Sequence, residues 1–262
     1  MTEPAQHDSA TPGTEALWLE LGTHTGKTPT RLLVLLHGAG STPETFAPVA
    51  LAWQFKFPNA AAVVMQGIEP GSTGRGYDWF DPGKVGAEAG ELAAASAAEV
   101  ARRVATAQQT MNIDPAHTII IGFSQGGTVA LEMARLESPC AAIVVAHAAR
   151  LQRPIAPGSV VQPAVHLLHG EFDTQLPAQF SVRAYRALRD AGARVTLDVI
   201  ADGVHSIGQD MINVGTVRAM QTVFSHRKKI DINQFQASLT LSLDSIEQAE
   251  AEQAGGAASK PH

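Results

Sequence analysis

The sequence predicts an α/β protein in which a mostly parallel central sheet is covered by helices on both faces. Short apolar runs such as 31–38 and 61–66 lack the alternation of a half-exposed strand. We therefore expect strands that are buried on both faces. Segments of helical character separate these runs between residues 15 and 229, an order that is typical of parallel sheets.

In the first part of the chain, we expect strands at 15–22, 31–38 and 61–66. Residues 42–55 start like a helix, although Pro48 predicts a break or a late start because proline removes a helical hydrogen bond. The glycine-rich residues 67–86 predict a long loop.

The clearest helix of the chain is predicted at 87–112, which is rich in alanine and has few helix breakers. Asp114 is expected to cap a short helical turn that has Pro115 in its first position. The remaining elements are expected as strands at 117–123, 141–147, 164–170 and 194–200, and as helices at 124–137, 177–192 and 206–229.

One domain over residues 15–229 accounts for this alternation, with a flexible N-terminus at 1–14 and a partly disordered extension at 230–262. The net charge is −6 and no basic stripe occurs, which argues against nucleic acid as a partner. No apolar run approaches the roughly 18 residues of a membrane span, and the N-terminus does not resemble a secretory signal. The single cysteine, Cys140, excludes an internal disulfide, so a cytoplasmic protein is expected.

Ser124 stands in a Gly-x-Ser-x-Gly pattern between a predicted strand and a predicted helix. The pattern alone is weak, because 23 glycines in 262 residues produce such matches by chance. Its strand–turn–helix context is the one that a nucleophile elbow requires, with Gly122 and Gly126 leaving room where strand and helix approach. The alternative is an ordinary turn that happens to contain a serine.

A serine hydroxyl is a weak nucleophile and needs a base that is oriented by a carboxylate. Asp173 follows one predicted buried strand, and His205 follows the predicted last strand after a glycine-containing loop. Because sites in parallel sheets lie at the carboxyl ends of strands, we expect Ser124, Asp173 and His205 to converge. Their order along the chain is also the order of a triad on such a sheet.

Other acidic residues and histidines compete for these roles. Glu171 lies in the same loop as Asp173, but Asp173 is better placed. Asp202 is expected to stabilise the turn before His205. Three histidines lie on or beside strands and are expected in core or strand-end positions: His147, His166 and His169.

Acyl transfer also needs N–H donors that hold an oxyanion. The N–H of Gln125, the residue after the serine, is expected to be one donor, through its backbone rather than its side chain. The second donor is expected from the loop 37–40, where Ala39 is favoured. His37 is expected to hold this loop rather than to transfer protons.

Five segments occur in the order and rough spacing of a known family: LLHGAG, YDWFD, GFSQGG, HGEFDTQLP and DGVHS. On these segments, residues 15–228 resemble the α/β-hydrolases of the phospholipase/carboxylesterase family, which includes acyl-protein thioesterases. The resemblance implies an α/β-hydrolase fold, no metal and no organic cofactor, and it is compatible with a homodimer. The residues that it implies are the triad Ser124, Asp173 and His205, the oxyanion donors Ala39 and Gln125, and the acyl-pocket loop residues Trp79 and Phe80. For Trp79 and Phe80, simple packing of the loop is the alternative.

The chain has Ser41 where the thioesterase branch usually has an acidic residue, and its extension at 230–262 is long. It is therefore more similar to the bacterial carboxylesterase branch than to the protein-depalmitoylating one. We expect a serine carboxylesterase that acts on a small-molecule ester. The alternatives are an acyl-(protein) thioesterase, a lysophospholipase or a noncatalytic binding protein on this fold.

The connection at 148–163 is too short for a separate helical cap, so no large cap domain is expected. The site should then be open, with a shallow acyl pocket lined by loops such as 71–86. For this reason we expect short-to-medium acyl esters to be preferred over long chains.

Overall fold

The computed structural model describes residues 17–225, so the segments expected to be flexible or disordered at 1–14 and 230–262 lie outside the described residues. The chain divides into two compact units, Met1–Val217 and Arg218–His262. In the second unit, the described residues 218–225 are helical. The described residues 17–217 belong to the first unit.

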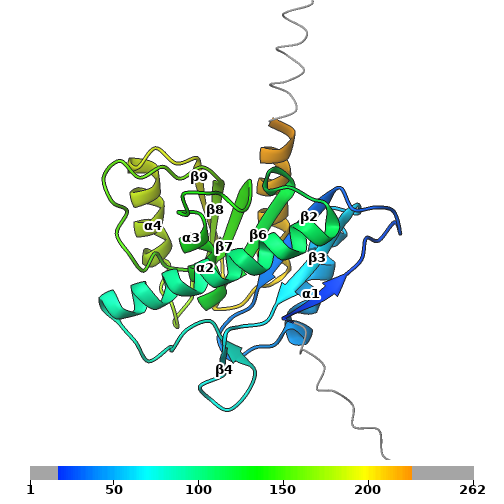
Figure 1. Cartoon of the computed structure of the whole chain (residues 1–262). Coiled ribbons are helices and arrows are strands. Elements are labelled where there is room, and N and C mark those ends of the chain that lie inside the picture. The colour runs from blue at the N-terminus through cyan, green and yellow to red at the C-terminus, as the bar shows by residue number, and fades with distance from the viewer. Residues whose placement is uncertain (1–16, 226–262) are drawn as a thin grey trace, which may run out of the picture. The chain divides into compact units, whose positions relative to one another are not determined.

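A seven-stranded sheet forms the centre of this unit, in the order β1-β3-β2-β6-β7-β8-β9 (Figure 1). The edge strand β1 is antiparallel to β3, and every other pair of neighbours is parallel. The strands are β1 (Trp18–Leu21), β2 (Arg31–Leu36), β3 (Ala60–Met65), β6 (Thr118–Phe123), β7 (Ile143–His147), β8 (Ala164–Gly170) and β9 (Val195–Ile200). The predicted mostly parallel sheet is thus confirmed.

The central strands are buried almost throughout. Apart from Arg31 at the start of β2 and Phe123 at the end of β6, every residue of β2, β3, β6, β7 and β8 is buried. Apolar runs without alternation are stable in this position because helices cover both faces of the sheet. The edge strands β1 and β9 are only partly buried.

Three helices cover one face: α2 (Gly86–Met111), α3 (Gln125–Met133) and α4 (Gln179–Asp190). Their buried residues form one apolar cluster with alternate residues of the strands, such as Leu32, Val34 and Leu36 of β2. Figure 1 shows α2 crossing in front of the sheet. The other face carries α1 (Pro43–Gln54) and the helical residues 209–217, which meet at the ring of His147.

The break or late start predicted from Pro48 is wrong, because α1 begins at Pro43 and continues through Pro48. Thr42 and Thr45 cap the helix reciprocally: the Thr42 Oγ1 accepts from the Thr45 N–H at 3.2 Å, and the Thr45 Oγ1 accepts from the Thr42 N–H at 3.0 Å. Phe46 and Trp53 lie on the buried face. Burial of large apolar side chains, at roughly 1.5–3 kcal/mol each, offsets the loss of about 3 kcal/mol that an internal proline causes.

Two connections matter for the site. The predicted loop at 67–86 contains a small antiparallel hairpin of β4 (Glu69–Pro70) and β5 (Tyr77–Asp78). The segment 148–163 contains no helix or strand, as expected for a chain without a large cap.

A 3₁₀ turn, η1 (Pro115–His117), begins after Asp114, whose carboxylate accepts from the His117 N–H at 2.9 Å, as predicted.

The strand order reverses between β2 and β6, since the chain moves from β2 outward to β3 and later from β6 outward to β7. Loops that leave neighbouring strands at such a reversal diverge and open a crevice. Among residues 17–225, no helix combines the length and apolar character that a membrane crossing requires.

Candidate active site

Ser124 occupies a sharp turn between β6 and α3. Its backbone has φ 54° and ψ −115°, a conformation that is strained for a residue with a side chain. Its N–H donates to the carbonyl of His147 at 2.9 Å, and its own carbonyl accepts from the N–H of Thr128 at 3.0 Å. These bonds hold the turn so that the hydroxyl projects from the end of the strand.

Gly122 and Gly126 make this turn sterically feasible, as predicted. A Cβ on Gly122 would lie 2.4 Å from the carbonyl oxygen of Gly126, and one on Gly126 would lie 2.4 Å from the carbonyl oxygens of Leu36 and His37. Because backbone atoms cannot yield as side chains do, any larger residue would push α3 away from the sheet.

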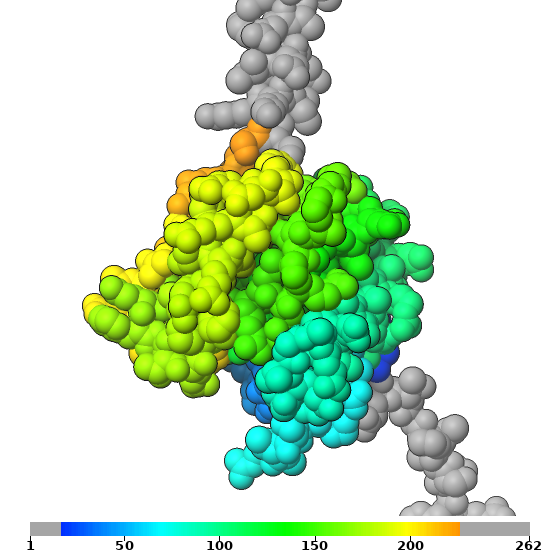
Figure 2. All heavy atoms as spheres, turned by 90° about the vertical axis from the view of Figure 1, so that its left-hand side faces the viewer, coloured from blue at the N-terminus to red at the C-terminus, as the bar shows by residue number. Residues whose placement is uncertain are grey.

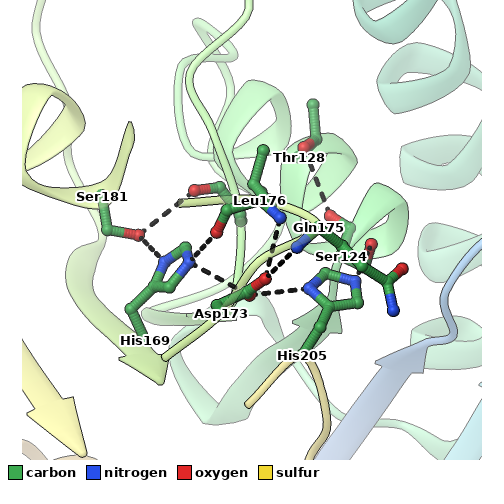
Figure 3. A network of polar contacts seen from close by, with 9 residues as sticks. Ser124, Thr128, His169, Asp173, Gln175, Leu176, Ser181 and His205 are labelled. Atoms are coloured by element: carbon green, nitrogen blue, oxygen red, sulfur yellow. Dashed lines mark hydrogen bonds and ion pairs between the residues drawn. The ribbon is translucent and has the colours of Figure 1, made fainter. Parts of the chain in front are cut away.

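The structure brings the three predicted side chains together (Figure 3). The His205 Nε2 lies 3.0 Å from the Ser124 Oγ, and its Nδ1 lies 2.7 Å from the Asp173 Oδ2. Asp173 comes from the loop after β8 and His205 from the loop after β9. The imidazole can thus accept the serine proton at Nε2 while Nδ1–H donates to the carboxylate.

The carboxylate of Asp173 is buried and fully engaged. Its Oδ1 accepts from the N–H groups of Gln175 at 3.0 Å and Leu176 at 2.8 Å. Burial would raise the pKa of the Asp173 carboxyl, but the Leu176 N–H and the His205 side chain outweigh burial and hold that pKa below its ordinary value. Asp173 is therefore ionised at neutral pH.

The competing residues lie elsewhere. Glu171 is exposed, and Asp202 has the left-handed φ of a turn residue, 56°. His166 is hydrogen-bonded to Thr196, and His147 is fully buried in the core. Cys140 is not a rival nucleophile, because burial raises the pKa of its thiol to about 11.

His169 is buried, as expected, but it also touches the site from the other side of Asp173. Its Nδ1 lies 2.7 Å from the Ser181 Oγ, and its Nε2 lies 2.6 Å from the Leu176 carbonyl and 3.3 Å from the Asp173 Oδ2 (Figure 3). Sequence reasoning missed this contact, although the spacing of four residues between His169 and Asp173 was visible.

Ala39 and Gln125 both line the cavity beside Ser124. Within the described part of the chain, neither backbone N–H donates a hydrogen bond to a carbonyl or a side chain. Two free donors beside a nucleophile are what an oxyanion hole requires.

Asp78 holds the Ala39 loop and was not predicted. Its buried carboxylate accepts from the Gly40 N–H at 2.7 Å through Oδ1 and from the Ser72 N–H at 2.8 Å through Oδ2. The only hint in the sequence was an acidic residue inside the apolar segment YDWF.

The side chain of Gln125, for which the sequence predicted no role, holds the loop after β5. Its Oε1 accepts from the Trp79 N–H at 2.8 Å, and its Nε2 donates to the Phe80 carbonyl at 2.7 Å. Phe80 lines the cavity of Ser124, whereas Trp79 is absent from that lining. The Trp79 ring is buried, and its Nε1–H donates to the His37 carbonyl at 2.7 Å.

His37 has a structural position, as expected. Its Nδ1 lies 2.8 Å from the Gly38 carbonyl, and the Gly67 N–H lies 3.3 Å from its Nε2. These partners fix the neutral tautomer that is protonated at Nδ1. Burial also lowers the pKa of His37, so this ring holds the loop in its neutral form.

The cavity at Ser124 has a volume of about 220 Å³, which is small beside the roughly 300–1,000 Å³ of pockets for drug-sized ligands. It is lined by Ala39, Phe80, Pro82, Ser124, Gln125, Thr128, Arg150, Gln152, Gln175, Leu176 and His205. In Figure 2, the cyan and teal residues of the loop after β3 lie below the green and yellow-green segments, which contribute most of the other lining residues. Within residues 17–225, His, Cys, Asp and Glu form no group of three arranged to hold a metal ion.

Comparisons with known proteins agree with this geometry. Residues 23–217 match the phospholipase/carboxylesterase family. The chain is 30% identical over 198 residues to Esterase YpfH of Escherichia coli (strain K12), which covers 75% of this chain and 81% of that protein.

Solved structures of the α/β-hydrolase fold are similar as well. Esterase PE8 is 26% identical with a TM-score of 0.71, covering 78% of this chain and 97% of that one. The Bacillus cereus carboxylesterase, at 18% identity and a TM-score of 0.66, covers 79% and 96% and shows the fold alone. Family, relative and fold lead to one conclusion: the chain belongs to the phospholipase/carboxylesterase family.

Proposed function

We propose that this carboxylic ester hydrolase is a serine esterase. Ser124 is its nucleophile, His205 is its general base, and Asp173 is the carboxylate that orients His205. The observation that carries the proposal is the continuous chain of hydrogen bonds from the Ser124 Oγ through the His205 ring to the Asp173 carboxylate. His205 removes the serine proton as Ser124 attacks the ester carbonyl, and Asp173 stabilises the imidazolium that forms. The His205 imidazolium donates its proton to the departing alcohol as the ester C–O bond breaks, which leaves the acyl-enzyme and a neutral histidine. Water activated by His205 then attacks the acyl-enzyme, which releases the carboxylic acid and restores Ser124.

The backbone N–H groups of Ala39 and Gln125 are proposed to hold the tetrahedral oxyanion. Support comes from their free donors on the cavity wall and from the position of Gln125 at the first turn of α3, where the helix dipole favours negative charge. Phe80 is proposed to contact the substrate. Trp79, with its buried ring, is proposed to act through the loop.

A labelling experiment tests the nucleophile. A fluorophosphonate probe should label the wild type and not Ser124→Ala, and ester hydrolysis should fall by several orders of magnitude in that variant. Ser159→Ala, in the 148–163 segment, is the matched serine control and should label normally. An unlabelled wild type, or a labelled Ser124→Ala, would contradict the proposal and favour a noncatalytic binding protein.

Short-to-medium acyl esters are the proposed substrates. The small cavity and the absence of a cap in 148–163 support this preference, because neither offers apolar cover for a long chain. A p-nitrophenyl ester series should give its highest kcat/KM at short or medium chains. A maximum at long chains would favour the lysophospholipase alternative, and faster turnover of matched thioesters would favour the thioesterase.

The proposed site of action is the cytoplasm, as the composition indicates. Assembly as a homodimer is a hypothesis taken from the family resemblance. Light scattering on the purified full chain would decide it by giving the mass in solution.

A further inference from the structure

One side chain on the wall of the cavity carries a permanent charge that the proposed hydrolysis does not use. Arg150 follows β7 and lines the cavity together with Gln152 and with Phe80 of the loop after β5. A guanidinium keeps its proton at any ordinary pH, so this wall is cationic whenever the enzyme is active.

Among residues 17–225, Arg150 forms no ion pair with a carboxylate. Its contacts are neutral. The guanidinium carbon lies 5.9 Å from the centroid of the Phe180 ring. The amide of Gln152 meets its hydrogen-bonding needs with its oxygen turned toward Arg150, where it accepts from Nε at 3.2 Å and Nη2 at 3.1 Å. Among residues 17–225, no protein group accepts from its Nη1–H donors, and Arg150 lines the cavity.

Two neighbouring arginines, Arg135 and Arg153, do form ion pairs, and these pairs hold the segment that carries Arg150 in place. Glu132 of α3 is fully buried and pairs with Arg135 at 3.0 Å and with Arg153 at 2.7 Å. Arg135 also donates to the carbonyls of Arg153 at 3.1 Å and Pro154 at 2.7 Å. These bonds attach the chain just after Arg150 to α3, the helix that begins at the nucleophile. Arg150 therefore lies on a segment that is fixed to α3.

We propose that Arg150, oriented by Gln152, forms a carboxylate-binding subsite, and that the preferred substrates are esters that also carry a free carboxylate. This inference rests on the proposed function and names its substrate class. A planar guanidinium matches a carboxylate in shape, and its single positive charge matches a monoanion. Because the cavity holds only about 220 Å³, the carboxylate must lie a short distance from the ester carbonyl. A half-ester of a short dicarboxylic acid has this form.

The test measures one ratio, which is kcat/KM for a half-ester divided by kcat/KM for the matching neutral methyl ester. Hydrolysis of monomethyl succinate, glutarate and adipate is compared in a pH-stat with that of the methyl esters of the matching monocarboxylic acids. In the wild type, kcat/KM should be higher for the half-esters, and this advantage should shrink as NaCl is raised while the neutral esters are unaffected. In Arg150→Met the ratio should fall by roughly tenfold or more, the order expected when a hydrogen bond between charged groups is lost.

Arg183→Met is the matched control, because Arg183 also lies over the Phe180 ring, at 5.7 Å, but does not line the cavity. Its ratio should stay within about twofold of the wild type. Arg150→Lys, which keeps the charge but not the planar fork, should lose less of the ratio than Arg150→Met.

A second readout is independent of turnover. Ser124→Ala retains Arg150, so glutarate should bind it measurably by calorimetry, and the double variant with Arg150→Met should lose that binding. Equal ratios in the wild type and Arg150→Met would overturn the subsite, even with neutral esters hydrolysed and the probe attached at Ser124. Failure of the probe to label the wild type would instead overturn the proposed function itself.

Discussion

His169 touches the buried carboxylate from the side opposite His205. Its Nε2 faces two oxygen acceptors, the carbonyl of Leu176 at 2.6 Å and the Asp173 Oδ2 at 3.3 Å, so this nitrogen must carry a proton. A proton held there stabilises the ionised form of Asp173 and fixes its orientation toward His205. His169 is thus a positioning residue for the proposed reaction, with no contact to the reacting atoms.

We predict that His169→Phe lowers kcat by roughly tenfold, because a hydrogen bond to a charged group is lost. Without the donor the pKa of Asp173 rises, so the acid limb of the kcat/KM profile should move to higher pH. His169→Gln, whose amide can donate, should restore part of both effects. A pH–rate profile of the three proteins measures this. An unchanged acid limb in His169→Phe would reduce His169 to a packing role.

Single residues of the site were predictable where they lie shortly after the end of a strand. The convergence of Ser124, Asp173 and His205 was predictable because each follows a strand in an order that a parallel sheet brings together. The parts played by Asp78 and the Gln125 side chain were not found. Their partners lie 38 and 46 residues away in sequence, and no local pattern indicates such pairs.

At the scale of elements, the hairpin of β4 and β5 and the loop after it act as a clamp on the site. Asp78 binds the Ala39 loop on one side, and the backbone of Trp79 and Phe80 binds the Gln125 side chain on the other. The two proposed oxyanion donors are therefore held at a fixed separation by one short segment.

We predict that Asp78→Asn lowers both activity and stability. The new amide NH₂ would face the N–H of Ser72 or Gly40, so the buried side chain at position 78 would carry an unsatisfied donor, at a cost of about 1–3 kcal/mol in the free energy of unfolding. Displacement of the Ala39 loop should lower kcat/KM by roughly tenfold or more. Urea unfolding and ester kinetics measure the two effects.

Asp81→Asn is the control for Asp78→Asn, since it removes the same charge from an exposed loop. Within the part of the chain that the structure describes, the Asp81 carboxylate accepts only from the Gly83 N–H, at 2.8 Å. This control should change neither quantity appreciably. Equal losses of stability and kcat/KM in the two variants would mean that the negative charge of Asp78 matters and its two hydrogen bonds do not.

Elements were predicted well where tertiary burial and local pattern agree. The central strands are mostly apolar because both of their faces are covered. Helix α1 shows the opposite case, since Pro48 disfavours a helix locally while capping by Thr42 and burial of Trp53 favour it. Local sequence does not show how much burial stabilises this helix, because that burial depends on the sheet against which the helix packs.

For the whole unit, the reversal of strand order between β2 and β6 explains why the site lies where it does. It separates the loop of Ala39 from the turn of Ser124, and β8 and β9 then supply Asp173 and His205 from the same edge of the sheet. The architecture was predictable because these constraints act on every strand. The chemistry of the cavity wall, including Arg150, was not, because it depends on an irregular segment.

The stability of the unit should respond to one buried histidine outside the site. His147 is fully buried, and within residues 17–225 neither of its ring nitrogens has a hydrogen-bond partner. It packs edge-on against Trp53 of α1, with Gly215 beside it. Burial lowers the pKa of His147 from 6.5 to about 3. Between these values, the unfolded chain binds a proton at this position that the folded chain rejects.

The free energy of unfolding should therefore decrease as the pH falls from 6.5 toward 3, with His147 contributing at most about 1.4 kcal/mol per pH unit. His147→Leu removes this contribution. We predict that its stability relative to the wild type improves steadily from pH 7.5 to pH 5, because at pH 7.5 neither state of the wild type is protonated there. Urea unfolding at several pH values measures this difference. The exposed His117, replaced by glutamine, is the control and should show a much weaker trend. A difference between His147→Leu and wild type that is independent of pH would mean that His147 is protonated equally in both states.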